Sequence, residues 1–279
     1  MNLGKKIFWL LVLMISGYSG CFFKPSERGV IKIKGSDTML FLTSSLAKEF
    51  MKKNPTISIY VEGGGTKTGV DALAKGKIDI CSASRNLKFD EIQVISDEFR
   101  SVGVTTLIAK DALSIFLNPK NPIKKLSLKD VRNIFTCKIT NWKEIGGSNK
   151  TIRVLNRSLN SGTYLYFKEH VLMNEDYCYD IETIPTTKEI MKIVSQDESA
   201  VGYGGIGYSD GIIHAAINDV YPTEENVRNE KYPISRYLMF ITLTMPEDNI
   251  KKFIDWVLSP EGQTIVKQAG FIPLWERSN

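Results

Sequence analysis

The sequence predicts an α/β protein of two lobes, each a mainly parallel β-sheet flanked by helices. Short apolar segments alternate with amphipathic segments of helical length, as they do in βαβ units. This alternation occurs twice, before and after the Asn-Pro pairs near residue 120. The chain has 279 residues, of which 43% are hydrophobic, so it is long enough to bury two cores.

The first series of elements runs from residue 30 to residue 80. Apolar side chains alternate with polar ones where we expect strands, and recur every three or four residues where we expect helices. A glycine-rich run separates the second strand from the second helix. The expected strands are 30–34, 57–61 and 78–80, and the expected helices extend from Met39 to the Asn54-Pro55 pair and around 70–74.

A long β-prone stretch at 102–117 precedes the second series, and we expect the polar residues within 109–111 to interrupt it. The later elements are expected at 127–135 (helix), 151–155 (strand), 163–172 (helix), 232–243 (strand), 249–258 (helix) and 260–269 (helix). Lobe boundaries then fall near 112–118 and 230–236. We therefore expect residues 30–111 together with 236–279 in lobe I, and residues 112–235 in lobe II.

The N-terminus predicts a secretory signal. Lys5 and Lys6 precede about nine apolar residues, and small residues follow before Cys21. This apolar run is shorter than the roughly 20 residues that span a bilayer. The segment resembles a bacterial lipobox with Tyr18 in place of the usual Leu, which predicts cleavage before Cys21 and lipid attachment to its sulfur. Residues 1–20 are then a lipoprotein signal peptide and residues 21–29 a tether; simple secretion and a retained anchor are the alternatives.

The charge balance argues against a nucleic-acid partner. The chain has 36 Lys and Arg residues against 31 Asp and Glu, a formal charge of +5. Removal of the signal, which carries Lys5 and Lys6, lowers this charge to +3. Basic and acidic residues alternate along the chain, without a basic block long enough to neutralise a row of phosphates.

Three cysteines follow Cys21, at positions 81, 137 and 178. Their spacing matches no zinc or CxxC pattern, so we expect neither a metal nor a cofactor. At most one pair can form a disulfide, and buried free thiols are the simpler expectation.

Two strand-to-helix junctions, one in each expected lobe, carry the same chemistry. Gly35-Ser36-Asp37-Thr38 and Ser161-Gly162-Thr163 each place Ser-x-Thr where a helix begins. Free backbone N–H groups and hydroxyls at such a position form a seat for an oxyanion. Arg157 adds a guanidinium that can fork onto two oxygens. The simpler alternative is that these Ser and Thr residues are plain helix caps.

Three other motifs are weaker. Residues 62–69 form a glycine loop without the Walker A spacing, and residues 82–85 offer Arg85 for an anion or for a surface ion pair. Residues 202–207 match the dinucleotide pattern G-x-G-x-x-G. We reject a dinucleotide site there, because only Ala200-Val201 precede it as strand and Asp210-Gly211 interrupt any helix that follows.

In this order the loops resemble the substrate-binding protein of bacterial ABC phosphate transporters, the phosphate-specific-transport (Pst) family. The Arg-x-x-x-Ser-Gly-Thr element is the most specific part of the resemblance, which covers about residues 30–208. The matching elements are Gly35-Ser36-Asp37-Thr38, Glu62-Gly63-Gly64-Gly65-Thr66 with Gly69, Ala83-Ser84-Arg85, Arg157 with Ser161-Gly162-Thr163, and Val201-Gly202-Tyr203.

The resemblance implies a type II periplasmic-binding fold, in which hinge strands join two lobes and phosphate lies in the cleft between them. It also implies a monomeric, lipid-anchored receptor in the bacterial cell envelope that delivers phosphate to the transmembrane subunits of an ABC permease. The phosphate-binding residues that it implies are Ser36, Thr38, Met39, Thr66, Arg85, Arg157, Ser161, Gly162 and Thr163.

One position departs from the family. Some members have Asp where this chain has Arg85, and that Asp accepts the proton of hydrogen phosphate. A guanidinium can only donate, so rejection of sulfate, which carries no proton at neutral pH, needs another acceptor. Asp37 is the nearest candidate in the sequence.

Other functions stand as alternatives: a receptor for another tetrahedral oxyanion such as sulfate, a sensor or adhesin on the same fold, and a secreted phosphoesterase. An esterase needs a nucleophile with a base, or metal ligands. The two histidines, His170 and His214, lie in no spaced His/Asp/Glu cluster. We therefore expect a receptor with no catalytic residues.

Overall fold

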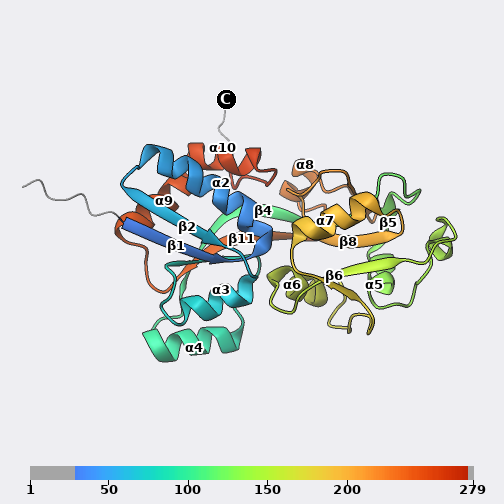
Figure 1. Ribbon diagram of the computed structural model, residues 1–279, viewed down its shortest axis with the longest axis horizontal. Coiled ribbons are helices and arrows are strands. Elements are labelled where there is room, and N and C mark those ends of the chain that lie inside the picture. Colours follow the sequence, from blue (N-terminus) through green and yellow to red (C-terminus); the bar gives the residue numbers. More distant parts are fainter. Residues whose placement is uncertain (1–28, 276–279) are drawn as a thin grey trace, which may run out of the picture.

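The computed structural model describes residues 29–275, which form two α/β lobes side by side (Figure 1). The strands β4 (Val104–Leu117) and β11 (Ser235–Thr242) lie at the centre. The first lobe contains β1 (Gly29–Gly35), β2 (Ile57–Glu62), β3 (Ile80–Ala83), α2 (Asp37–Lys53), α3 (Thr66–Leu73), α4 (Phe89–Phe99), α9 (Asp248–Leu258) and α10 (Pro260–Gln268). The predicted signal peptide and the lipid site at Cys21 lie outside the described residues.

The second lobe holds the intervening part of the chain. Its strands are β5 (Lys125–Leu126), β6 (Arg153–Arg157), β7 (Glu182–Ile184), β8 (Ala200–Gly205), β9 (Ile213–His214) and β10 (Ala216–Ile217). Its helices are α5 (Leu128–Phe135), the 3₁₀ turn η1 (Trp142–Ile145), α6 (Gly162–His170), α7 (Thr187–Gln196) and α8 (Glu224–Arg228).

The main sheet has the strand order β2-β1-β3-β11-β4-β8-β6-β7. β1 runs parallel to β2 and β3, and β6 runs parallel to β7 and β8, so the outer strands of both lobes are parallel as predicted. β4 changes its partner midway: Ala112 faces Ser235 on β11, whereas Leu113 faces Gly205 on β8. One strand therefore serves both lobes.

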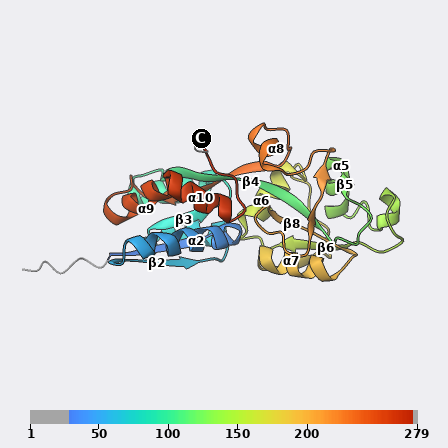
Figure 2. The ribbon, with the colours of Figure 1, turned by 90° about the horizontal axis from the view of Figure 1, so that it is seen from above.

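Helices cover both faces of the sheet in each lobe. In the first lobe α2, α9 and α10 lie together over one face (Figure 2), where Phe50 and Phe253 belong to a shared core. α3 and α4 cover the opposite face and bury Val70 and Ile95 (Figure 1). The last two helices thus return to the first lobe. Within residues 29–275, no helix is both long and apolar enough to cross a bilayer.

Most of the expected elements are confirmed, with three differences. β4 runs without a break through 109–111, because Asp111 is buried opposite Arg236 on β11 and forms an ion pair with it. β3 begins at Ile80, the residue where the expected strand was to end. The helices α4, α7 and α8, the turn η1 and the short strands β5, β7, β9 and β10 were not predicted. The rejected dinucleotide motif lies largely within β8, which is buried along its whole length.

The expectation of free thiols is wrong for two of the cysteines. Cys137 and Cys178 form a disulfide, although 41 residues separate them in the sequence. The fold brings the end of α5 against the segment before β7, where the Cys178 N–H donates to Phe135 O at 3.0 Å. Cys81 is free and buried, and burial raises the pKa of its thiol well above the usual value.

Candidate anion-binding site

Three helices begin where the lobes meet. α2 and α3 come from the first lobe and α6 from the second. Thr38 Oγ1 at the start of α2 lies 2.8 Å from Thr163 Oγ1 at the start of α6. The Lys67 N–H in α3 donates to Asn160 O, just before α6, at 3.1 Å. The positive ends of three helix dipoles therefore lie close together, an arrangement that favours an anion.

Hydroxyl groups line this meeting point. Ser36 Oγ donates to Ser84 Oγ at 3.0 Å, and Thr66 Oγ1 lies 3.5 Å from Ser84 Oγ. Ser36, Thr38, Thr66, Ser84, Ser161 and Thr163 are each at most 2% exposed. Each hydroxyl carries one proton that it can donate to an oxyanion.

Plain helix capping accounts for only one of the predicted serines. Ser161 Oγ accepts from the Tyr164 N–H at 3.3 Å and caps α6. Ser36 precedes α2 but makes no capping bond with its side chain, and the residue that precedes α3 is Gly65. Ser36 Oγ donates to Ser84 Oγ instead, another hydroxyl of the first lobe.

Gly162 lies where the two lobes are in close contact. A Cβ at this position would lie 2.3 Å from Thr66 Oγ1 and 2.8 Å from Ser84 Oγ, both in the first lobe. Gly65 on the other side has φ +95°, and its Cβ would lie 2.4 Å from Asn160 O. Only glycine fits such contacts without displacing its neighbours. The described conformation is therefore a closed one.

Arg157 at the end of β6 connects the lobes electrostatically. Its guanidinium is 1% exposed and donates through Nη2 to Asp37 Oδ2 at 2.7 Å and through Nη1 to Thr187 Oγ1 at 2.7 Å. Its Nε has no hydrogen-bond partner within residues 29–275. Burial lowers the pKa of Arg157 from its usual value, while the Asp37 carboxylate opposes that shift. An anion close to Nε would satisfy this buried donor.

Two of the predicted residues have their donor groups directed away from the hydroxyl cluster. Arg85 points to Glu91, with Nη1–Oε2 and Nη2–Oε1 distances of 2.7 Å and 2.6 Å, so an ion pair holds its guanidinium, although the pair is buried and not on the surface. The Met39 side chain belongs to the core of the first lobe, and its N–H donates to Ser36 O at 3.0 Å.

Arg236 and Asp111 are neighbours of the site that sequence reasoning missed. Arg236 Nε donates to Asp111 Oδ2 at 3.0 Å, and Nη1 donates to Thr163 Oγ1 at 3.1 Å. Each is a charged residue within an otherwise mostly apolar strand, a signal present in the sequence. The sequence pattern predicts a break in the strand at Asp111, whereas in the structure this carboxylate lies within β4 and pairs with Arg236.

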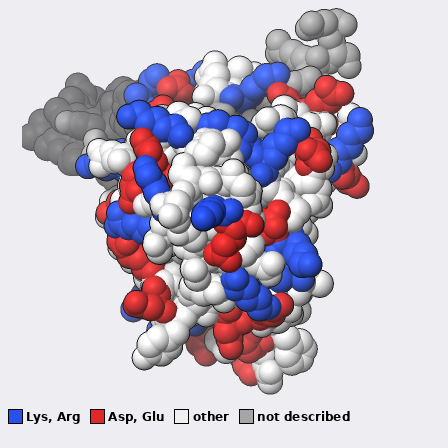
Figure 3. Space-filling view, turned by 90° about the vertical axis from the view of Figure 1, so that its right-hand side faces the viewer, with Lys and Arg blue, Asp and Glu red and all other residues white. Residues whose placement is uncertain are grey.

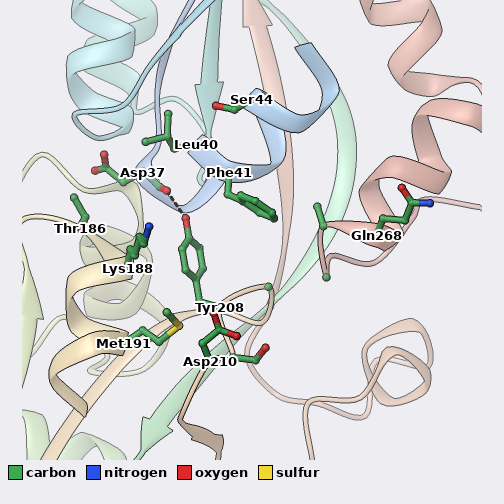
Figure 4. Close-up of a pocket in the computed structure, with 14 residues that line it drawn as sticks. Asp37, Leu40, Phe41, Ser44, Thr186, Lys188, Met191, Tyr208, Asp210 and Gln268 are labelled. Atoms are coloured by element: carbon green, nitrogen blue, oxygen red, sulfur yellow. Dashed lines mark hydrogen bonds between the residues drawn. The ribbon is translucent and has the colours of Figure 1, made fainter. Parts of the chain in front are cut away.

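A cavity of about 620 Å³ opens beside Asp37, between α2 and α7 (Figure 4). Phe41 lines it from the first lobe and Met191 from the second. Tyr208 also faces it, and its hydroxyl donates to the Asp37 main-chain oxygen at 2.9 Å. The carboxylate of the Asp37–Arg157 pair thus lies at the edge of this cavity, whereas the hydroxyl cluster is buried.

The outer end of the second lobe has a mixed charge pattern. Figure 3 shows Lys and Arg side chains interspersed with Asp and Glu on that face. Elsewhere in the chain, Lys125–Asp219 and Lys150–Glu198 are examples of exposed pairs of opposite charge. Such a surface does not provide the continuous basic face that a nucleic acid requires.

Two α/β lobes joined by shared strands, with buried donors from both at their interface, define a periplasmic-binding type of protein. Residues 24–261 match the family model described as the PBP superfamily domain. The chain is 30% identical over 253 residues to the phosphate-binding protein PstS of Bacillus subtilis, across 88% of this chain and 81% of that protein. PstS of Pseudomonas aeruginosa is 29% identical over 269 residues, across 88% and 83% of the two chains.

A solved structure agrees with these relatives. The putative phosphate ABC transporter substrate-binding protein of Clostridium perfringens, determined with bound phosphate, superimposes with a TM-score of 0.83 and 31% identity. The alignment covers 88% of this chain and all of that one. The chain belongs to the PstS family of phosphate-binding proteins, and the expected type II periplasmic-binding fold is confirmed.

Proposed function

We propose that this protein captures inorganic phosphate outside the cytoplasm and delivers it to the membrane subunits of an ABC transporter. The observation that carries the proposal is the meeting of three helix N-termini with buried hydroxyls from both lobes, next to Arg157. Closure of two lobes would strip water from the ion and surround it with donors. The phosphate-bound relative from Clostridium perfringens supports phosphate as the ligand.

The ligand set that we propose consists of donors that the closed conformation brings together: Ser36, Thr38, Thr66, Arg157, Ser161, Gly162 and Thr163. Met39 can join them only if its N–H leaves Ser36 O. We omit Arg85, because Glu91 holds both of its terminal nitrogens.

We propose Asp37 as the acceptor that distinguishes hydrogen phosphate from sulfate. Its Oδ1 accepts from the Gly64 N–H at 2.9 Å and its Oδ2 from Arg157 at 2.7 Å. Each carboxylate oxygen has more than one lone pair, so one more proton can be accepted there. Sulfate would place an unprotonated oxygen against this carboxylate.

We propose that the mature protein is a monomer anchored to the bacterial cell envelope through a lipid on Cys21. The Cys137–Cys178 disulfide supports an extracytoplasmic location, because such bonds persist mainly in oxidising compartments. The proposed lobes are residues 30–111 with 236–279, and residues 112–235. The change of partner along β4 between Ala112 and Leu113 supports the first of these boundaries.

We propose a receptor without enzymatic activity. The structure does contain a Ser–His pair, with Ser114 Oγ 2.8 Å from His214 Nδ1. Ser114 is fully buried in β4, so this pair is not placed to attack a substrate from solvent. Within residues 29–275, no group of three or more His, Cys, Asp or Glu side chains is placed to hold a metal ion.

The experiment is calorimetric titration of the purified mature protein with phosphate and with sulfate. We expect one phosphate per chain and sulfate affinity at least about 100-fold weaker, as for a site whose acceptor receives no proton from the wrong ion. Asp37→Asn should reduce the ratio of phosphate affinity to sulfate affinity. Absence of phosphate binding at millimolar concentration contradicts the proposal, and equal sulfate binding would make the protein a general oxyanion receptor.

A further inference from the structure

Two opposite charges face each other on the strands that link the lobes. Asp111 on β4 and Arg236 on β11 are direct cross-strand partners, 0% and 5% exposed. Arg236 Nε donates to Asp111 Oδ2, and Nη2 lies 2.9 Å from the same oxygen without the alignment of a hydrogen bond. Asp111 Oδ1 accepts from the Ile206 N–H at 3.1 Å. The carboxylate therefore holds the guanidinium in one orientation.

The remaining nitrogen of Arg236 contacts both lobes. Nη1 donates to Ser84 O at 3.3 Å in the first lobe and to Thr163 Oγ1 at 3.1 Å in the second. Stability alone is a poor reason to retain such a pair, because a buried ion pair can often be replaced by apolar residues without loss of stability.

The contact with Thr163 restricts where that hydroxyl can donate. A guanidinium has no acceptor, so Thr163 Oγ1 must be the acceptor of this hydrogen bond. The positive charge behind the oxygen turns the O–H away from the hinge strands, toward Thr38 Oγ1 at 2.8 Å and the cleft. Without Arg236 the same oxygen could present a lone pair to an anion, which would repel it.

We propose that Arg236, held by Asp111, is a positioning residue that keeps the Thr163 hydroxyl, and Thr38 next to it, as donors toward the bound oxyanion. This inference rests on the proposed function of the same site. It assigns a role to two residues of the linking strands, which lie outside the loops that supply the proposed ligands.

The test is a double-mutant cycle measured by phosphate titration. The paired substitution Asp111→Asn with Arg236→Gln replaces the ion pair by two amides, leaves the net charge unchanged and strands no buried charge. We expect it to weaken phosphate binding at least about tenfold, the effect of losing a charged hydrogen bond. In a Thr163→Val background, where no hydroxyl remains to be positioned, the same pair should change affinity by less than about twofold.

Thermal melting without phosphate verifies that each variant is folded. If the amide pair does not fold, Arg236→Lys replaces it in the cycle, because a lysine keeps the charge next to Asp111 but cannot also reach Thr163. An equal loss of phosphate affinity with and without the Thr163 hydroxyl would show a purely structural role and overturn the inference. Wild-type phosphate affinity in a folded variant of the Asp111–Arg236 pair would also overturn it. Wild-type protein that binds no phosphate would overturn the proposed function as well.

Discussion

Arg153 and Arg157 lie on the same strand, yet only one of them can serve an anion. Arg153 is at the outer end of β6, where its side chain is 42% exposed and pairs with Glu182 and Asp197. Arg157 is at the inner end, enclosed between the lobes. The two positions therefore offer a matched pair of substitutions with the same change in charge.

We expect Arg157→Ala to weaken phosphate binding at least about 100-fold, because a buried charged donor is lost. Arg153→Ala should leave phosphate affinity unchanged, since surface ion pairs contribute little. Calorimetry on both variants checks this prediction. Near-wild-type affinity in Arg157→Ala would remove this residue from the site.

His214 predicts a pH dependence of stability. Burial next to Phe116 lowers the pKa of His214 to about 4. In the unfolded chain this imidazole binds a proton near pH 6.5. The contribution of neutral His214 to the free energy of unfolding is therefore fully present above about pH 6.5 and is lost as the pH falls toward 4. The loss amounts to about 2–3 kcal/mol.

Urea unfolding at pH 7 and pH 4.5 measures this loss. His214→Gln should reduce the difference between the free energies of unfolding at the two pH values, whereas the same change at the exposed His170 should not. An unchanged difference in His214→Gln would show that other groups carry the acid sensitivity.

At the scale of single residues, the sequence motifs indicated those proposed ligands whose role follows from their position at a helix start. Ser36, Thr38, Ser161 and Thr163 all lie at helix starts, which sequence patterns reveal. Arg236 escaped prediction because its partners lie far away in sequence: Thr163 is 73 residues and Asp111 125 residues distant. Likewise, Arg85 lies in a family motif, but its pairing with Glu91 depends on how the chain turns into α4.

Among the elements, α4 and α7 were missed for different reasons. α4 buries only Glu91 and Ile95, so its amphipathic pattern is faint. α7 buries Ile190, Met191 and Val194 at helical spacing, a pattern that was available in the sequence. β4 appeared broken because Asp111 is polar, and only its cross-strand ion pair makes the strand continuous.

The disulfide joins the end of α5 to the segment before β7 and should stabilise the second lobe. A loop closed over 41 residues predicts a contribution of about 4 kcal/mol from the restricted unfolded chain. We expect reductant, or Cys137→Ala with Cys178→Ala, to lower the free energy of unfolding by about 2–4 kcal/mol. Urea denaturation with and without dithiothreitol measures the effect.

The double variant supplies its own control. The double variant keeps Cys81, which is a free thiol and offers the reductant no bond to break. Reductant should therefore have no further effect on the unfolding of this variant. A further loss would mean that the reductant acts elsewhere than on the Cys137–Cys178 bond.

At the scale of the whole molecule, Gly162 governs how closely the lobes can approach. Gly162→Ala adds a Cβ 2.3 Å from Thr66 Oγ1 and should hold the lobes apart. We expect small-angle scattering to show that phosphate compacts the wild-type protein but not this variant, with affinity lowered at least about tenfold. Leu159→Ala, at a residue 70% exposed, is the control and should behave as wild type. Full compaction of Gly162→Ala would contradict the closed geometry described above.

The two-lobed architecture was predictable because βαβ alternation is a strong local pattern that occurs twice. The way the lobes are connected was less accessible. β4 changes partner between two adjacent residues, Ala112 and Leu113, and no change in composition accompanies it. Tertiary packing decides that β4 pairs with β11 along its first part and with β8 along its second part.

The burial of the hydroxyl cluster has a consequence for timing. Thr38 and Thr66 are 0% exposed and Thr163 is 1% exposed, so under the proposed function an ion held among them would be shielded from solvent while the lobes are together. Its dissociation would then be limited by the rate at which the lobes part. Under the proposed function, residence time would become a property of the linking strands, and a membrane partner that pulled the lobes apart would trigger unloading at any external phosphate concentration.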